Sequence, residues 1–131
     1  MANPTNSFRT PLGRARGLGS AKLGAQHWLA YRIASAGLAV LTVLFVALVL
    51  GLIGASYEEV VATFKKPYPV ILTILFLGAT FHHAAYGLQE VFEDYLHGKL
   101  SKLAAIGLTK AAALVLFLLA SFAVLKIAFG A

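Results

Sequence analysis

Three long stretches with almost no charged side chains limit what this sequence can fold into. The first runs from Ile33 to Tyr57, the second from Pro67 to Gln89, and the third from about Leu103 to Leu125 with Lys110 as its one charge. About 20 apolar residues suffice for a helix to cross the hydrocarbon of a bilayer. Only 12% of the 131 residues are charged, whereas about a quarter is usual in soluble domains. The sequence therefore predicts an all-α membrane protein with three transmembrane helices.

These stretches divide the chain into a polar arm and a membrane anchor. Residues 1–29 are basic and glycine-rich and contain no acid, and we expect them to form a cytoplasmic arm before a three-helix anchor at residues 30–131. The apolar runs predict spans at about 31–55, 67–95 and 103–127. An acid-free start that contains arginine is also typical of a mitochondrial transit peptide, which is the alternative for the arm.

The distribution of basic residues predicts the orientation of the chain. Cytoplasmic loops of membrane proteins carry an excess of Lys and Arg. Six basic residues lie in the arm and the second link and three lie in the first link and the tail: Arg9, Arg14, Arg16, Lys22, Lys99 and Lys102 against Lys65, Lys66 and Lys126. We therefore expect a cytoplasmic amino terminus and a place in the bacterial inner membrane, with the mitochondrial inner membrane as the alternative.

Composition also excludes several classes of function. The chain has no cysteine, which excludes disulfides, cysteine-held iron–sulfur clusters and covalent haem attachment. It has no phosphate-cradling glycine loop, no nucleophile–base pair and no zinc-binding HExxH helix. Its net charge of +6 fits membrane topology and anionic lipid, and its basic residues are not interleaved with aromatic residues as base stacking requires. We expect membrane lipid and no nucleic acid among its partners.

The second span contains a histidine pair, and a histidine inside a hydrophobic span is costly enough to indicate function. In a helix, His83, Gly87 and Asp94 share one face, because steps of four and eleven residues rotate by about 40° and 20°. A flat cofactor fits such a face, and imidazole is a standard axial ligand of haem iron. The alternative is a histidine that bonds a neighbouring helix and holds no metal. His82 points about 100° away and is expected to make a polar contact in the bundle.

A helical partner subunit is expected, because three helices leave His83 without the partners that a buried polar group needs. The chain offers one well-placed haem ligand, so a six-coordinate iron needs its second ligand from another subunit. Small residues of the second span permit close helix contact: Gly78, Ala79, Ala84 and Gly87. A small transporter component is a further alternative, but its path would have only His82, His83 and Lys110 as ionisable groups, on too few helices.

Four residues near the membrane boundaries have two interpretations each. Tyr95 is an interface residue or a hydrogen-bond donor to a quinone carbonyl. Asp94 is a solvated acid, or it orients a basic partner or feeds protons to a reduced quinone. Arg32 reaches lipid phosphate, or its guanidinium pairs with a carboxylate such as a haem propionate. Trp28 is an interface anchor or part of the rim of a quinone pocket. Tyr95 follows His83 by about 18 Å of helix, so the two are expected to act at different depths.

A motif on the second of the three spans resembles the small membrane-anchor subunits of succinate dehydrogenase (complex II): His83-x3-Gly87-x3-Val91-x2-Asp94-Tyr95. The likeness is to the cytochrome b556 small subunit, the D chain, of alphaproteobacterial type. It extends to the basic arm with Gly17 to Lys22, followed by His27-Trp28 and Arg32, and so covers nearly the whole chain.

The resemblance implies roles for particular residues. His83 would be an axial ligand to haem b, with the other ligand supplied by the large cytochrome b anchor subunit, and the two anchors would form one helical bundle around the haem. Arg32 and His27 would lie near the haem propionates. Tyr95 would hydrogen bond a carbonyl of ubiquinone near the iron–sulfur subunit, with Asp94 beside it.

The resemblance also implies a place in a respiratory enzyme. In this family the flavoprotein subunit oxidises succinate, and electrons cross three iron–sulfur clusters to the quinone at the anchor. The chain would then be a subunit of succinate dehydrogenase that helps bind haem b and form the ubiquinone-reduction site, without a succinate-oxidising site of its own. The alternative is a haem-free structural anchor of another respiratory complex, such as fumarate reductase.

Overall fold

The fold is helical wherever it has regular structure among the residues described in this computed structural model, which are 10–12, 16 and 24–130. Four helices follow one another along the chain: α2 (Gly24–Leu50), α3 (Tyr57–Phe64), α4 (Pro67–Tyr95) and α5 (Lys99–Phe129). Of these, α2, α4 and α5 are long and apolar enough to cross a membrane. The chain divides into two compact units, 1–31 and 32–131, and the packing described below is that of the second.

The three long helices follow the predicted spans, with differences at their ends. α4 covers the expected 67–95, and α5 extends beyond the expected 103–127 on both sides. α2 starts at Gly24, ahead of the expected start at residue 31, and it ends at Leu50, ahead of the expected end at residue 55. It ends early because a turn follows in which Gly54 adopts a φ of 80°, a left-handed conformation that glycine adopts without steric cost.

The first link contains a short helix, α3, that the sequence analysis did not predict. Ser56 caps its start, because the Ser56 hydroxyl accepts from the amide of Glu59 at 3.3 Å and the Glu59 carboxylate accepts from the amide of Ser56 at 2.7 Å. This reciprocal pair is a capping box, and Glu58 and Glu59 also favour the positive end of the helix dipole. The Ser-x-x-Glu spacing is visible in the sequence, so this helix could have been predicted.

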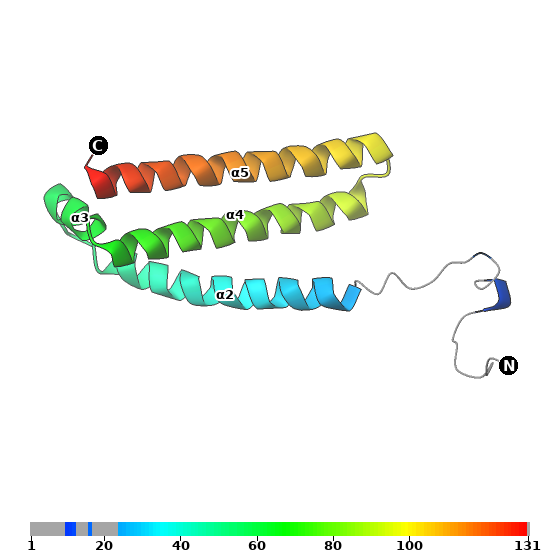
Figure 1. The fold of residues 1–131 in the computed structure, drawn as a ribbon, viewed down its shortest axis with the longest axis horizontal. Helices are drawn as coiled ribbons and strands as arrows, with labels where there is room; N and C mark the ends of the chain where they lie inside the picture. Colours follow the sequence, from blue (N-terminus) through cyan, green and yellow to red (C-terminus); the bar gives the residue numbers. More distant parts are fainter. Residues whose placement is uncertain (1–9, 13–15, 17–23, 131) are drawn as a thin grey trace. The chain divides into compact units, whose positions relative to one another are not determined.

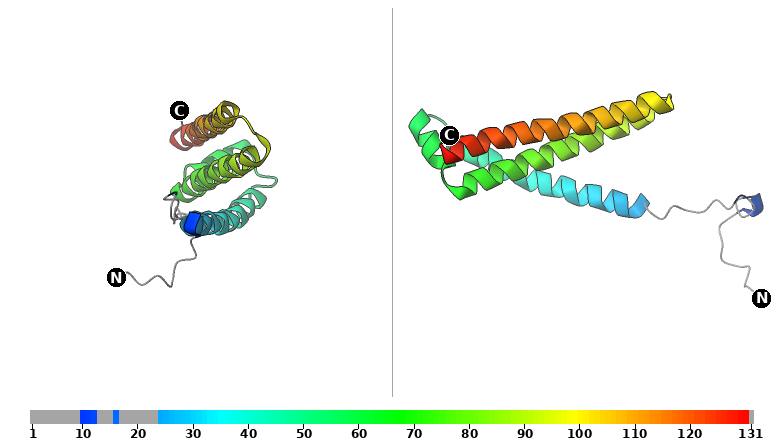
Figure 2. Two further views of the ribbon diagram at one scale, coloured as in Figure 1. Left: turned by 90° about the vertical axis from the view of Figure 1, so that its right-hand side faces the viewer. Right: turned by 45° about the horizontal axis from the view of Figure 1, so that its top comes forward.

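Helix α4 lies between α5 and the 32–50 part of α2 (Figures 1 and 2). It packs along α5, to which the short link 96–98 joins it. On its other side the rings of Phe45 and Phe76 stack at 4.3 Å with an interplanar angle of 10°. In the described part of the chain, α4 therefore has a spanning helix on each of two sides.

The helices bury little apolar surface against one another. The buried apolar side chains among the described residues are those of Val70, Leu72 and Ala85 on α4, with Pro69 also buried there. Large apolar side chains point outward instead, such as Val43, which is 69% exposed, and Phe122, which is 67% exposed. In a bilayer such surfaces meet lipid tails or the helices of another subunit, so they need no covering by the chain itself.

We expect Gly54→Ala to destabilise the fold, because an alanine in the left-handed region costs about 1 kcal/mol. Gly51→Ala is the matched control: Gly51 is not at positive φ, and an added Cβ would sit 3.5 Å from the carbonyl oxygens of Ala47 and Leu48, an ordinary contact. Unfolding in mixed detergent micelles checks this. Equal effects of the two substitutions would contradict the role assigned to Gly54.

Candidate functional site

His83 lies in the middle of α4 on the side that faces α2. Its Nδ1 is 3.5 Å from the hydroxyl of Ser35, a long hydrogen bond whose direction depends on the imidazole tautomer. The side chains of both residues are partly exposed. Ser35 lies level with His83 and Phe45 lies level with Phe76, so α2 and α4 run antiparallel. The contact therefore holds the histidine ring between two helices and within the span.

The surroundings of His83 fit a ring-shaped cofactor that carries a metal. A histidine that binds a metal through one ring nitrogen ordinarily has the other held by a hydrogen bond, which fixes the orientation of the ring. Ser35 is placed to supply that bond to Nδ1. Gly87 lies one turn further along α4 on the same face. A Cβ added there would meet no other atom within 4 Å, so the surface of α4 is flat and open at this position. These residues could hold a haem group with His83 as an axial ligand, and that role stays a prediction.

Arg32 lies on the same side of α2 as Ser35. The two are three residues apart, which places them one turn apart along the helix and about 60° apart around it. The Arg32 side chain is exposed. Arg32 therefore lies within one turn of Ser35, which contacts His83. A site shared by Arg32 and His83 requires such a placement. Its pairing with a propionate stays a prediction.

Trp28 and His27 precede this region and belong to the other unit of the chain. Trp28 is on α2 with its side chain 60% exposed. His27 is also on α2, but its side chain lies outside the described part of the structure. Their predicted roles at the haem propionates and the quinone rim stay predictions.

Tyr95 and Asp94 form the end of α4 and are not brought to His83. The Tyr95 side chain is 77% exposed, and Asp94 is exposed beside it. Because α4 is continuous from Pro67 to Tyr95, twelve residues of helix separate Tyr95 from His83, about 18 Å along the axis. The two predicted sites therefore lie at different depths on one rigid element.

A hydrogen-bond cluster that the sequence analysis missed holds the end of α4. The Lys102 ammonium donates to the carbonyl oxygen of Glu93 at 2.7 Å, and the Gln89 amide donates to the Glu93 carboxylate at 2.6 Å. A cation at the carboxyl end of a helix also interacts favourably with the helix dipole. Lys102 thereby ties the start of α5 to the turn of α4 that carries Asp94 and Tyr95. A lysine soon after the end of a helix is the signal that could have revealed it.

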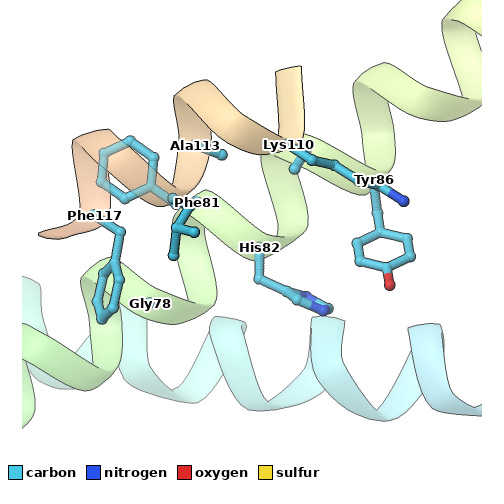
Figure 3. Close-up of a pocket in the computed structure, with 9 residues that line it drawn as sticks. Gly78, Phe81, His82, Tyr86, Lys110, Ala113 and Phe117 are labelled. Atoms are coloured by element: carbon cyan, nitrogen blue, oxygen red, sulfur yellow. The ribbon is translucent and has the colours of Figure 1, made fainter. Parts of the chain in front are cut away.

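His82 lines a groove between α4 and α5 (Figure 3). It lies about 100° from His83 around the helix. Its ring lies 4.6 Å from the ring of Tyr86, the next residue on the same face, and the Lys110 ammonium lies 5.1 Å from the centre of the Tyr86 ring. The groove has a volume of about 240 Å³. His82 thus contacts a residue of its own helix, Tyr86. The ammonium of Lys110 lies against the face of the same Tyr86 ring, a cation–π interaction.

Comparison with known proteins gives one consistent answer. The sequence profile of the family described as succinate dehydrogenase/fumarate reductase transmembrane subunit matches residues 6–125. The succinate dehydrogenase hydrophobic membrane anchor subunit of Paracoccus denitrificans is 38% identical over 99 residues, which are 76% of this chain and 77% of that protein. The protein of the same description from Rickettsia bellii is 29% identical over 92 residues, 70% of this chain and 74% of that protein. No solved structure gives a significant match.

We expect Lys102→Met to loosen the end of α4, because the carbonyl of Glu93 loses its charged donor. Amide hydrogen exchange of residues 93–98 should become about fivefold faster, which corresponds to a partly exposed hydrogen bond of roughly 1 kcal/mol. Lys99→Met is the control, since Lys99 is exposed at the start of the same helix. The same acceleration in both variants would show that Lys102 has no special role there.

Proposed function

Because this chain belongs to the succinate dehydrogenase/fumarate reductase transmembrane subunit family, we propose that it anchors a succinate:quinone oxidoreductase in the membrane and helps bind haem b and ubiquinone there. The family match over 6–125 is the observation that carries the proposal. The three apolar helices agree with a multi-pass membrane protein. As a membrane anchor, the chain is one subunit of an oxidoreductase complex. We take its membrane to be the bacterial inner membrane, since the named relatives are bacterial.

The partners that this function requires follow from what the chain lacks. It has no cysteine and no motif for flavin or succinate, so electrons must reach it from other subunits. A flavoprotein subunit that oxidises succinate and an iron–sulfur subunit that passes the electrons on would dock at the exposed end of α4. A large cytochrome b anchor subunit would pack beside α2 and α4 and supply the second ligand to the haem.

His83 is the residue proposed to bind the haem iron. Ser35 would orient its ring through Nδ1, and the open backbone at Gly87 would let the porphyrin stand close to α4. Arg32 would pair with a propionate from one turn further along α2, with His27 as a second candidate for this role. Haem b supplies reversible one-electron chemistry when it is bound. A ligand from each of two subunits would also hold the two anchors together.

Tyr95 and Asp94 are proposed to serve the quinone. Reduction of ubiquinone to ubiquinol takes two electrons, which succinate oxidation supplies, and two protons, which water at the membrane surface supplies. The exposed Tyr95 hydroxyl can donate a hydrogen bond to a quinone carbonyl, which stabilises negative charge that develops on that oxygen. The adjacent carboxyl of Asp94 can pass protons inward from solvent. Trp28 would lie at the rim of this pocket.

Substitution of His83 by alanine should abolish the haem signal. We expect the purified complex with His83→Ala to lose the low-spin haem b bands in a reduced-minus-oxidised spectrum, because the iron loses an axial ligand. His82→Ala should keep them, since His82 points about 100° away. A normal spectrum for His83→Ala would refute the ligand role, and a wild-type complex without any haem band would favour a haem-free anchor.

Substitution of Tyr95 by phenylalanine should slow quinone reduction alone. We expect the rate with ubiquinone to fall about fivefold to tenfold, the effect of one lost hydrogen bond. Reduction of an artificial dye by the soluble subunits should be unchanged, because it does not use the anchor. Tyr57→Phe is the control, since Tyr57 is equally exposed, at 79%, but begins α3 in the first link. Unchanged quinone turnover in Tyr95→Phe would remove Tyr95 from the site.

A further inference from the structure

The groove between α4 and α5 is almost wholly apolar, and three residues with polar side chains lie at one end of it (Figure 3). These residues are His82, Tyr86 and Lys110, and the Lys110 ammonium lies 5.1 Å from the centre of the Tyr86 ring. The apolar part is lined by Gly78, Phe81, Ala85, Ala113, Leu114 and Phe117. From Tyr86 to Gly78 the groove follows two turns of α4, about 12 Å along the axis. This is the shape of a site for an amphiphile with a polar head and an extended tail.

Gly78 shapes the inner end of the groove. An added Cβ there would lie 3.3 Å from the ring of Phe117, closer than most such contacts, so the missing side chain lets this ring pack against α4. The ring and the helix backbone then form a smooth apolar wall that extends toward the middle of the bilayer. Such a wall offers dispersion contacts to a flexible chain and no hydrogen bond.

Lys110 has no counter-ion of its own within the spans. All five acidic residues of the chain lie in the first link or at the end of α4: Glu58, Glu59, Glu90, Glu93 and Asp94. Glu90, the nearest of them along α4, makes no ion pair with Lys110 in the described part of the chain. The face of the Tyr86 ring offsets part of the charge but not all of it. A cation at this depth calls for an anion from outside the chain.

The depth of the Lys110 ammonium fits a lipid headgroup. It lies at the ring of Tyr86, which is one turn, or about 6 Å, inside Glu90 on α4. The uncharged run of this span ends at Gln89, so we expect this level to lie within about one turn of the boundary between headgroups and hydrocarbon, and lysine side chains reach such boundaries by extending along the helix. A phosphate can therefore meet the ammonium without entering the centre of the bilayer.

The groove lies on a different side of α4 from the face of His83. His82 is about 100° from His83 around the helix, and about 140° from Gly87. A subunit that packs against His83 and Gly87 therefore need not cover the groove.

From these observations we infer that the groove binds one anionic phospholipid from the leaflet nearest the α4–α5 link. Its phosphate pairs with the Lys110 ammonium and accepts hydrogen bonds beside Tyr86 and His82, and one acyl chain lies along the apolar part toward Gly78. Charge decides this occupant, because the head of a quinone is neutral and leaves the ammonium without a counter-ion. The site is separate from the proposed haem and quinone sites.

Lipid titration of the intact assembly tests the inference. The assembly is purified in neutral detergent, freed of loosely held lipid, and titrated with dioleoylphosphatidylglycerol while bound lipid is counted by native mass spectrometry. We expect Lys110→Gln to weaken binding of the first lipid about fivefold, the effect of one basic residue at the membrane surface. Lys110→Arg should keep the affinity, and Lys99→Gln, which removes an exposed lysine of the same helix, should leave it unchanged.

A second variant tests the apolar part of the groove. Ala113→Phe fills it but keeps Lys110, so it should also weaken binding of the phospholipid.

Two results would overturn the inference. One is equal binding of the lipid by the wild type and by Lys110→Gln, and the other is binding of dioleoylphosphatidylcholine as tight as that of dioleoylphosphatidylglycerol. Saturation by inorganic phosphate would show an anion site without a lipid tail, and displacement of the lipid by ubiquinone would show a quinone site. Loss of a partner subunit from Lys110→Gln but not from Lys110→Arg would show that a carboxylate of that subunit is the counter-ion.

Discussion

The cost of a polar side chain in the hydrocarbon of a bilayer organises this protein. A helix that crosses the membrane satisfies its own backbone, so the side chains alone decide which of its faces need a particular neighbour. His83 contacts Ser35 across two helices, while His82 and Lys110 both lie against the ring of Tyr86. Each polar group in the spans thus marks a place where lipid tails are a poor neighbour. These places are where cofactors, lipids and subunits are to be expected.

Helix α4 fixes the spacing between the polar sites of the spans. It is continuous over Pro67–Tyr95 and has a neighbour on either side, so the positions along it cannot shift independently. One face presents His83 toward α2, a second lines the groove with α5, and the last turn carries Asp94 and Tyr95, which we expect to lie at the membrane surface. His83, the proposed haem ligand, and Tyr95, the proposed quinone residue, are thereby held on different levels. Lys102 secures the outer level by its hydrogen bond to the carbonyl of Glu93.

The small core is consistent with a subunit that is completed by others. Few apolar side chains are buried among the described helices, and large ones cover their outer surfaces. A soluble protein of this kind would aggregate, whereas in a bilayer the same surfaces are solvated by lipid or paired with other helices. The family to which the chain belongs consists of transmembrane subunits of a larger oxidoreductase, which accounts for surfaces of both kinds.

The sequence by itself determined the number of spans, their approximate positions and the separation of His83 from Tyr95. These follow from hydrophobic run length and helical rise, which are local properties of the chain. Only the tertiary structure decided that Ser35 meets His83, that Lys102 reaches Glu93, and that Lys110 lies on Tyr86. The pattern of one helix shows which residues share a face but not which helix, or which level of it, that face meets. Those pairings depend on how the helices pack, and packing joins residues that are far apart in the chain.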